Sequence, residues 1–151
     1  MHRFRAQTTW EGTTGVGYAD YSRRHHSVCP PAGATLALSA DPIFRGELAL
    51  LNPEQLVVAA ASSCQLLSFL AVAAKARLDV VSYLDDAEGV MPDDGKPMRI
   101  ERIVLRPRVT FAGAVPANFE RLVELAHKEC FIANSLNAEV AVEATALTAL
   151  S

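Results

Sequence analysis

The sequence predicts an α+β fold in which antiparallel sheets pack on a long central helix. Its 151 residues, 50 % of them hydrophobic and 21 % charged, suit one globular domain spanning residues 1–151. Segments with strand-like alternation lie before and after a single long apolar helix, without the regular strand and helix alternation of a parallel sheet.

Residues 2–28 are expected to form a β-hairpin. Side chains such as Thr8 and Trp10 alternate with polar neighbours, and the segment 11–15 contains two glycines that favour a turn. The second strand of this hairpin is expected over residues 16–22.

The segment 29–51 is rich in proline, glycine and small residues and predicts a loop with one short strand at 35–38. Long loops with little periodicity often carry function. This segment is therefore a place to look for site residues.

The clearest helix signal begins at Asn52, which can cap the helix, and Pro53, which suits the first helical position. Glu54 favours the positive end of the helix dipole, and the helix is expected to run to about Arg77. Polar residues interrupt the apolar stretch 56–74, so we expect a core or subunit-interface helix and not a membrane span.

The C-terminal half alternates between strands and helices of shorter length. We expect a strand at 80–91, a strand at 100–111, an amphipathic helix opened by Pro116, a short helical segment at 131–136 and a closing strand at 138–148. No internal repeat is visible.

Charge and cysteine content exclude several classes of function. A formal net charge of −3 leaves no basic excess for nucleic acid or anionic membrane, so neither is an expected partner. The first residues lack the apolar core of a secretory signal, and three cysteines without regular spacing favour reduced thiols. A cytoplasmic location is therefore expected.

Cys64 and Cys130 are the two candidate reactive residues. Cys64 lies within the long apolar helix, where a cysteine is more often a small hydrophobe, although polar neighbours such as Ser63 and Gln65 weaken that interpretation because polar groups in a core need a reason. Cys130 lies where one helical segment ends and another begins, so free backbone amides there could lower its pKa. An ordinary core cysteine is equally compatible with that position, and the sequence alone cannot pair the two thiols.

These residues carry a resemblance to a known family. The motif Asn52-Pro53-Glu54-Gln55-Leu56, a cysteine ten positions after Glu54, and Cys130 opening the segment 130–136 resemble the OsmC/Ohr family of organic hydroperoxide reductases. The resemblance implies the OsmC-like intertwined homodimer and a cysteine-based peroxidase active in stress response. In that family the position of Cys64 is the peroxidatic cysteine and the position of Cys130 is the resolving cysteine.

The resemblance also implies that Glu54 and an arginine from a preceding segment activate the peroxidatic thiolate. Arg45 matches the loop arginine of the OsmC branch and is preferred, whereas Arg23 or Arg24 would take its place by analogy with the Ohr branch. Phe131 departs from the family, in which proline commonly follows the second cysteine. The departure bears on how fast a disulfide would close at Cys130.

The implied mechanism agrees with thiol chemistry. A free cysteine near pKa 8.5 is only about a few per cent thiolate at neutral pH, and a nearby guanidinium favours the thiolate. Glu54 alone would disfavour it, so its expected role is to pair with the arginine and fix its direction. The reaction needs no cofactor, only an external dithiol reductant, and the resemblance suggests a lipoyl group. The apolar neighbours of Cys64 suit bulky organic hydroperoxides better than hydrogen peroxide.

The spacing along the helix has a consequence for assembly. Ten helical residues rise about 15 Å, so Glu54 and Cys64 of one continuous helix cannot meet in one active site. Two such helices packed across a two-fold axis would bring Glu54 of one chain towards Cys64 of the other. A homodimer is therefore expected.

Other features favour simpler interpretations. His25, His26 and Cys29 lack the further ligands that a zinc site needs, so no metal is expected. Cys29, next to two prolines, is expected to be a bystander thiol. The rival hypothesis to the peroxidase is a stress-response or ligand-binding protein of the same fold without peroxidase activity.

Overall fold

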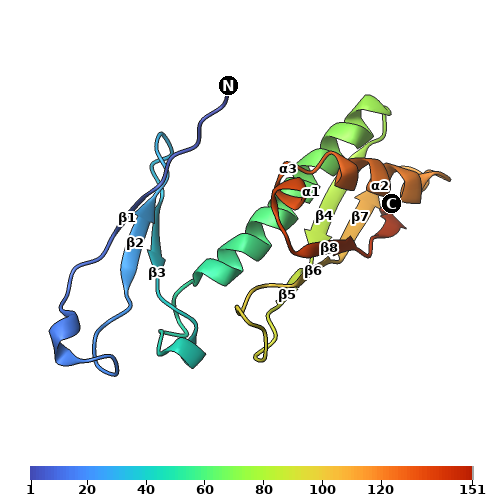
Figure 1. Ribbon diagram of the computed structural model, residues 1–151. Coiled ribbons are helices and arrows are strands. Elements are labelled where there is room, and N and C mark those ends of the chain that lie inside the picture. Colours follow the sequence, from blue (N-terminus) through green and yellow to red (C-terminus); the bar gives the residue numbers. More distant parts are fainter. Residues whose placement is uncertain (151) are drawn as a thin grey trace. The chain divides into compact units, whose positions relative to one another are not determined.

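The computed structural model describes residues 1–150 of the chain. The chain forms two compact units, one covering Met1–Leu56 and the other beginning at Val57. Figure 1 labels their helices and most of their strands. The expectation of one domain over 1–151 stays a prediction, and residue 151 lies outside the described residues.

The first unit holds one small antiparallel sheet in the order β1–β2–β3. Its strands are β1 (Gln7–Thr9), β2 (His25–Val28) and β3 (Thr35–Leu38), and the loops carry two short 3₁₀ turns, η1 (Thr14–Val16) and η2 (Pro42–Phe44). Gln7 pairs with Val28 and Val28 pairs with Thr35. The short strand expected at 35–38 is confirmed.

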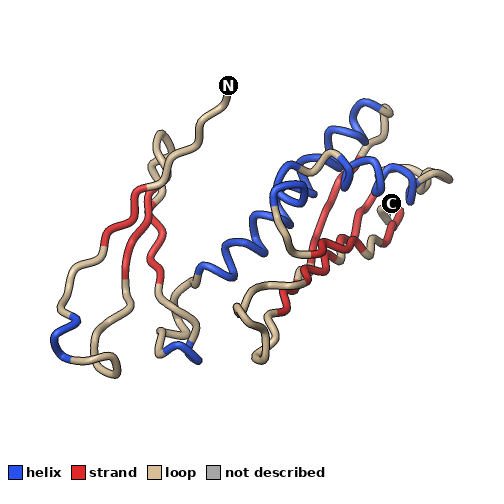
Figure 2. The backbone as a smooth tube through the Cα atoms, in the orientation of Figure 1, coloured by secondary structure: helices blue, strands red, loops and turns tan. Residues whose placement is uncertain are grey.

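The second strand of the expected hairpin was placed wrongly. Residues 16–22 are not a strand, and β1 pairs instead with β2 after a long loop, drawn in tan in Figure 2 except for the blue turn η1. The loop is held by contacts between residues far apart in sequence, such as the hydrogen bond from Trp10 Nε1 to the carbonyl of Ser22 at 2.8 Å. An alternation pattern does not reveal such contacts.

A tight turn ends the loop after β3. The Gly46 amide donates to the carbonyl of Asp41 at 3.1 Å, and the Gly46 Cα lies against the backbone of Ala40, where a Cβ would overlap the Ala40 carbonyl. Only glycine fits this close approach. Arg45 precedes it with φ at 64°, in the left-handed region.

Helix α1 (Pro53–Lys75) confirms the expected long helix and its start. Asn52 and Gln55 form a reciprocal cap, because Gln55 N donates to Asn52 Oδ1 at 2.8 Å and Asn52 N donates to Gln55 Oε1 at 3.1 Å. The helix ends two residues before the expected Arg77, whose φ of 59° is left-handed and stops the helical hydrogen bonding.

By length and composition α1 could cross a membrane, and 28 % of its most apolar stretch is buried within the chain. Leu67 is 64 % exposed and Leu70 37 % exposed. The helix therefore presents apolar surface that its own chain leaves open.

The second unit contains two three-stranded sheets, in the orders β4–β7–β9 and β5–β6–β8. Its elements are β4 (Val80–Asp85), β5 (Glu88–Val90), β6 (Arg102–Leu105), β7 (Pro107–Phe111), α2 (Phe119–Lys128), α3 (Phe131–Ser135), β8 (Glu139–Val142) and β9 (Thr145–Thr148). Helix α2 and the short helical segment at the position of α3 confirm the expected elements. Each of the three long strands expected in this unit is instead a pair of shorter strands, one for each sheet.

The α+β class is confirmed, and the sheets, which were expected to be antiparallel, contain parallel pairs as well. β8 pairs with β6 and β9 pairs with β7 in parallel, whereas β4·β7 and β5·β6 are antiparallel. Two helices separate the middle strands from the last ones, and a crossover of that length allows the chain to return in the same direction.

The core of the second unit has two hydrophobic clusters. The larger cluster joins α1, β7 and α2 through Phe69, Phe111 and Phe119. The centroid of the Phe119 ring lies 5.9 Å from that of Phe69 and 6.0 Å from that of Phe111. The smaller joins Ala61 of α1 to Ile103 and Leu105 of β6. Helix α1 thus packs on both sheets, which fixes the direction of its middle turns.

Candidate active site

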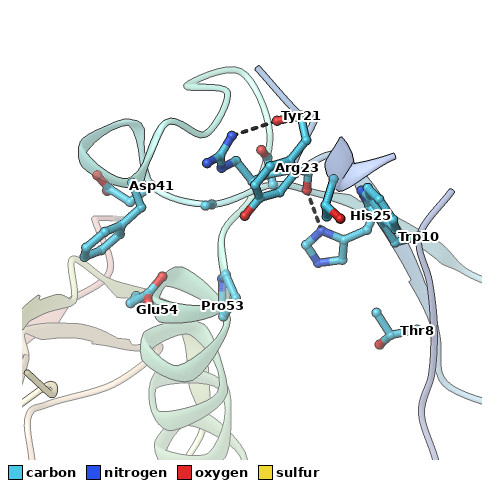
Figure 3. A pocket seen from close by; sticks show the side chains of 12 residues that line it. Thr8, Trp10, Tyr21, Arg23, His25, Asp41, Pro53 and Glu54 are labelled. Atoms are coloured by element: carbon cyan, nitrogen blue, oxygen red, sulfur yellow. Dashed lines mark hydrogen bonds between the residues drawn. The ribbon is translucent and has the colours of Figure 1, made fainter. Parts of the chain in front are cut away.

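The first unit contains a hollow of about 570 Å³. It is lined by Thr8, Trp10, Thr14, Tyr21, Arg23, His25, Ser39, Ala40, Asp41, Phe44, Pro53 and Glu54. Figure 3 shows the Arg23 guanidinium and the Glu54 side chain on two sides of the same space, with Trp10 and Tyr21 along one wall. Two of the residues named from sequence, Glu54 and Arg23, therefore line one pocket.

Arg23 is held firmly in this pocket. Its Nη1 donates to the Tyr21 carbonyl at 2.7 Å and its Nη2 donates to the Tyr18 carbonyl at 2.6 Å. The guanidinium also stacks on Tyr21, with Cζ 3.9 Å from the ring centroid, and lies 5.0 Å from the Tyr18 centroid. Such stacking and bonding fix the plane of a permanently charged group.

The other two candidate arginines lie elsewhere. Arg24 forms an ion pair with Glu47 at 2.6 Å, and this hydrogen bond holds the pKa of the Glu47 carboxyl below its usual value. Arg45 is exposed and does not line the Glu54 pocket. Its Cζ lies 5.8 Å from the centroid of the Tyr18 ring, which Arg23 also approaches. Of the three, Arg23 shares the pocket with Glu54.

Glu54 lies in the first turn of α1, which the Asn52 cap orients towards the hollow. Within residues 1–150 Glu54 makes no ion pair, so the expected pairing with an arginine is not formed inside one chain. His25 lines the same hollow, with Nδ1 hydrogen-bonded to the Arg23 carbonyl at 2.8 Å.

The two candidate cysteines both lie in the second unit. Cys64 is half-buried on α1 and borders an open hollow of about 700 Å³. The hollow is lined by Cys64, Leu67, Ser68, Ala71, Lys75, Lys128, Glu129, Phe131 and Asn134. A small molecule can therefore reach the Cys64 sulfur from one side.

Cys130 lies next to Cys64 but is fully buried. Burial raises the pKa of the Cys130 thiol, the amides of Ala133 and Ile132 lower it, and a hydrogen bond with Cys64 raises it. The expected effect of the free amides is present, but burial outweighs it and the net pKa is raised. Folding thus brings together two thiols that the sequence alone could not pair, one accessible and one enclosed.

The remaining sequence candidates have simpler surroundings. Phe131, directly after Cys130, is 80 % exposed and forms one wall of the hollow beside Cys64. Cys29 is exposed and lines a separate depression with the N-terminal segment. Its bystander role stays a prediction.

Several residues of these surroundings were not predicted from the sequence. Trp10 and Tyr21 line the Arg23 pocket in an edge-to-face pair with centroids 6.3 Å apart. The Tyr83 hydroxyl of β4 is buried without a hydrogen-bond partner in residues 1–150. The aromatic residues close to Arg23 in sequence were a usable signal. Nothing local marked Tyr83, because its position depends on how β4 packs against α1.

The arrangement defines an α+β protein with an accessible thiol beside a buried one, and a separate pocket that holds a fixed guanidinium and a carboxylate. The family described as OsmC-like protein matches residues 46–145, and the chain belongs to this family.

One solved structure supports the same family, and two more distant ones show the same fold. An OsmC-like protein of unknown function from Vibrio cholerae is 36 % identical, with a TM-score of 0.86 over 96 % of this chain and 100 % of that chain. The organic hydroperoxide resistance protein OsmC of Legionella pneumophila is 18 % identical, with a TM-score of 0.69 over 99 % of this chain and 98 % of that chain. OhrB of Bacillus subtilis, an organic hydroperoxide resistance protein, is 20 % identical, with a TM-score of 0.62 over 94 % and 98 %. No curated protein matches the sequence.

Proposed function

We propose that this protein is a thiol peroxidase that reduces organic hydroperoxides to alcohols. The observation that carries the proposal is the accessible Cys64 thiol beside the enclosed Cys130 thiol. The Cys64 thiolate attacks the terminal peroxide oxygen, the O–O bond breaks, and the departing alkoxide takes a proton to become the alcohol. Cys130 then attacks the sulfenic sulfur of Cys64, and the disulfide forms as water leaves.

Arg23 and Glu54 supply the activating charges in this proposal. Arg23 is oriented by two carbonyls and a tyrosine ring, which leaves its other N–H groups free to favour a thiolate and hold peroxide oxygens. The sequence preference for Arg45 stays a prediction, and the shared pocket with Glu54 favours Arg23.

A homodimer completes the site. Glu54 and Cys64 lie on one continuous helix, and ten residues of helical rise separate them by about 15 Å. The guanidinium pocket of one chain therefore serves the thiols of its partner, and the exposed apolar side chains of α1 lie at the interface.

The reductant and the cellular setting follow from the same chemistry. A small dithiol, such as a lipoyl group, regenerates the thiols by exchange, and the reduced cysteines fit the cytoplasm. Bulky organic hydroperoxides fit the hollow beside Cys64, whose walls include Leu67, Ala71 and Phe131.

The proposal is tested by adding one equivalent of cumene hydroperoxide to the reduced protein and analysing its peptides by mass spectrometry. Peptides containing Cys64 and Cys130 should become linked, and turnover with dithiothreitol should disappear in Cys64→Ser but persist in the control Cys29→Ser. Intact thiols after peroxide addition would favour the rival, a ligand-binding protein of the same fold.

A further inference from the structure

His25 lines the Arg23 pocket, and the reaction proposed above assigns it no role. The residue opens β2, and its side chain is half-buried. Its Nδ1 lies 2.8 Å from the Arg23 carbonyl oxygen. Because a carbonyl oxygen only accepts hydrogen bonds, Nδ1 carries the proton of the neutral ring and Nε2 keeps a free lone pair.

The second nitrogen of His25 is available within the pocket. Figure 3 shows the imidazole turned away from the Arg23 carbonyl at this nitrogen, which is directed into the space that Pro53 and Glu54 also border. Within residues 1–150, Nε2 makes no hydrogen bond. The ring can therefore take up a proton at Nε2 while the bond at Nδ1 keeps its orientation.

The other ionisable side chains of the pocket are less suited to carry a proton. They are Tyr21, Arg23, Asp41 and Glu54. A guanidinium keeps its protons, a carboxylate accepts hydrogen bonds without donating them, and a phenol gives up its proton less readily than an imidazolium. Asp41 also accepts a hydrogen bond from the Ile43 amide at 2.9 Å, as the cap of η2. Among these groups, imidazole is the one that accepts and returns a proton near neutral pH.

We propose that Nε2 of His25 carries the proton that passes from Cys64 of the partner subunit to the departing alkoxide. The proposal rests on the peroxidase function and the homodimer proposed above, and it assigns a further catalytic residue to the first step. In this step the Arg23 guanidinium stabilises the negative charge, and His25 moves the proton.

The step balances with this single proton. The Cys64 thiol gives its proton to Nε2, and the thiolate attacks the terminal peroxide oxygen, which keeps its own hydrogen and becomes the sulfenic hydroxyl. The S–O bond forms as the O–O bond breaks, and the electron pair of the O–O bond leaves on the alkoxide. The imidazolium then returns the proton to the alkoxide, which yields the alcohol and restores the neutral ring.

The need for this proton depends on the peroxide. An alkoxide is a strongly basic leaving group, so reduction of cumene hydroperoxide benefits from a proton donor at the breaking bond. Peroxyacetic acid instead releases acetate, which needs no proton at neutral pH. A loss confined to cumene hydroperoxide therefore separates proton transfer from a merely structural role.

The test compares the full-length wild type with His25→Asn and the control His26→Asn. An asparagine amide can still donate to the Arg23 carbonyl from about the position of Nδ1, but it has no proton to transfer. His26 is the exposed neighbour on β2, where successive side chains point to opposite faces, and it borders a different hollow with Glu11 and Arg24. Each reduced protein is mixed with either peroxide, and consumption of the Cys64 thiol is timed by alkylation and mass spectrometry.

In His25→Asn, oxidation of Cys64 by cumene hydroperoxide should slow by about 100-fold, the lower end of the range for general acid–base catalysis. Oxidation by peroxyacetic acid should stay within about twofold of the wild-type rate, which also shows that the variant is folded. With cumene hydroperoxide the wild-type rate should fall at alkaline pH as the imidazolium is lost, and His25→Asn should lack this fall. His26→Asn should match the wild type with both peroxides.

His25→Gln provides a second variant, because its amide reaches about the position of Nε2 without a transferable proton. It should show the same selective loss. Equal losses with the two peroxides, or an unchanged rate with cumene hydroperoxide, would overturn the role of His25. A wild type whose Cys64 reacts with neither peroxide would refute the peroxidase itself, and this inference with it.

Discussion

The assignment of Arg23 can be tested against Arg45 by paired lysine substitutions. Lysine keeps the charge but lacks the planar fork that holds two carbonyls at 2.7 and 2.6 Å while stacking 3.9 Å from a tyrosine centroid. Losing one oriented hydrogen bond to a charged reacting group costs about 1.5–3 kcal/mol, and each 1.36 kcal/mol is about tenfold in rate. Arg23→Lys should therefore lower kcat/KM for cumene hydroperoxide by about 10- to 150-fold.

Arg45→Lys is the matched control, because Arg45 is exposed and lies outside the pocket that holds Glu54. We expect its kcat/KM to stay within about twofold of the wild type, as for most surface substitutions. Turnover is measured with dithiothreitol as reductant, and urea midpoints are measured for both variants so that a loss of folding is not read as a loss of catalysis.

The opposite ranking would refute the reasoning. If Arg45→Lys lost tenfold or more while Arg23→Lys stayed near the wild type, the preference drawn from the sequence would be correct and the shared pocket would be irrelevant to activation. Equal losses would show that the two guanidiniums act together through the Tyr18 ring that both approach.

Three further predictions concern stability. Asn52→Ala removes the reciprocal cap with Gln55 and should lower the free energy of unfolding by about 1–2 kcal/mol in urea denaturation, the range for a lost cap. Gly46→Ala forces a Cβ into the Ala40 carbonyl and should cost about 2–4 kcal/mol, with a clear drop in melting temperature. Burial raises the pKa of Cys130 in the folded protein, so the neutral thiol contributes its full stability below the pKa of the unfolded chain, about 8.5, and loses it as pH rises through the folded-state pKa. The urea midpoint of the reduced wild type should therefore decline at alkaline pH, and reduced Cys130→Ala should lack this decline.

The start of the long helix was predictable because its signals are local. Asn52 and Pro53 act within one turn, and the structure places both as expected. The short strand at Thr35–Leu38 was also recovered, since small and apolar residues alternate there between loop-forming neighbours. Local propensity and local capping agree at these places.

Long-range pairing was not predictable from pattern. The strand that pairs with β1 is His25–Val28 and not the expected segment 16–22. The loop between β1 and β2 is held by hydrogen bonds of Trp10 and Arg23, whose partners lie two to twelve residues away along the chain. The parallel pairing of β8 and β9 likewise depends on where two helices return the chain, which alternation does not encode.

The candidate site shows the same division. The resemblance identified Cys64, Cys130 and Glu54, and the structure places the two thiols together. The resemblance favoured Arg45, but it carried no information on how each guanidinium is oriented, because that depends on carbonyls and rings supplied by folding. The unpaired Tyr83 hydroxyl was also invisible, since burial and the lack of a partner are properties of the packed core.

The distance along α1 between Cys64 and Glu54, whose pocket also holds Arg23, gives a direct test of the dimer. Arg23→Ala and Cys64→Ser should each be inactive as homodimers, because each lacks one component of both sites. In a refolded equal mixture about half of the dimers are hybrids, and each hybrid has one site with Arg23 from one chain and Cys64 from the other. Activity should therefore recover to about a quarter of the wild-type value. If the guanidinium and the thiol of one chain formed the site, every hybrid would lack a complete site and the mixture would stay inactive.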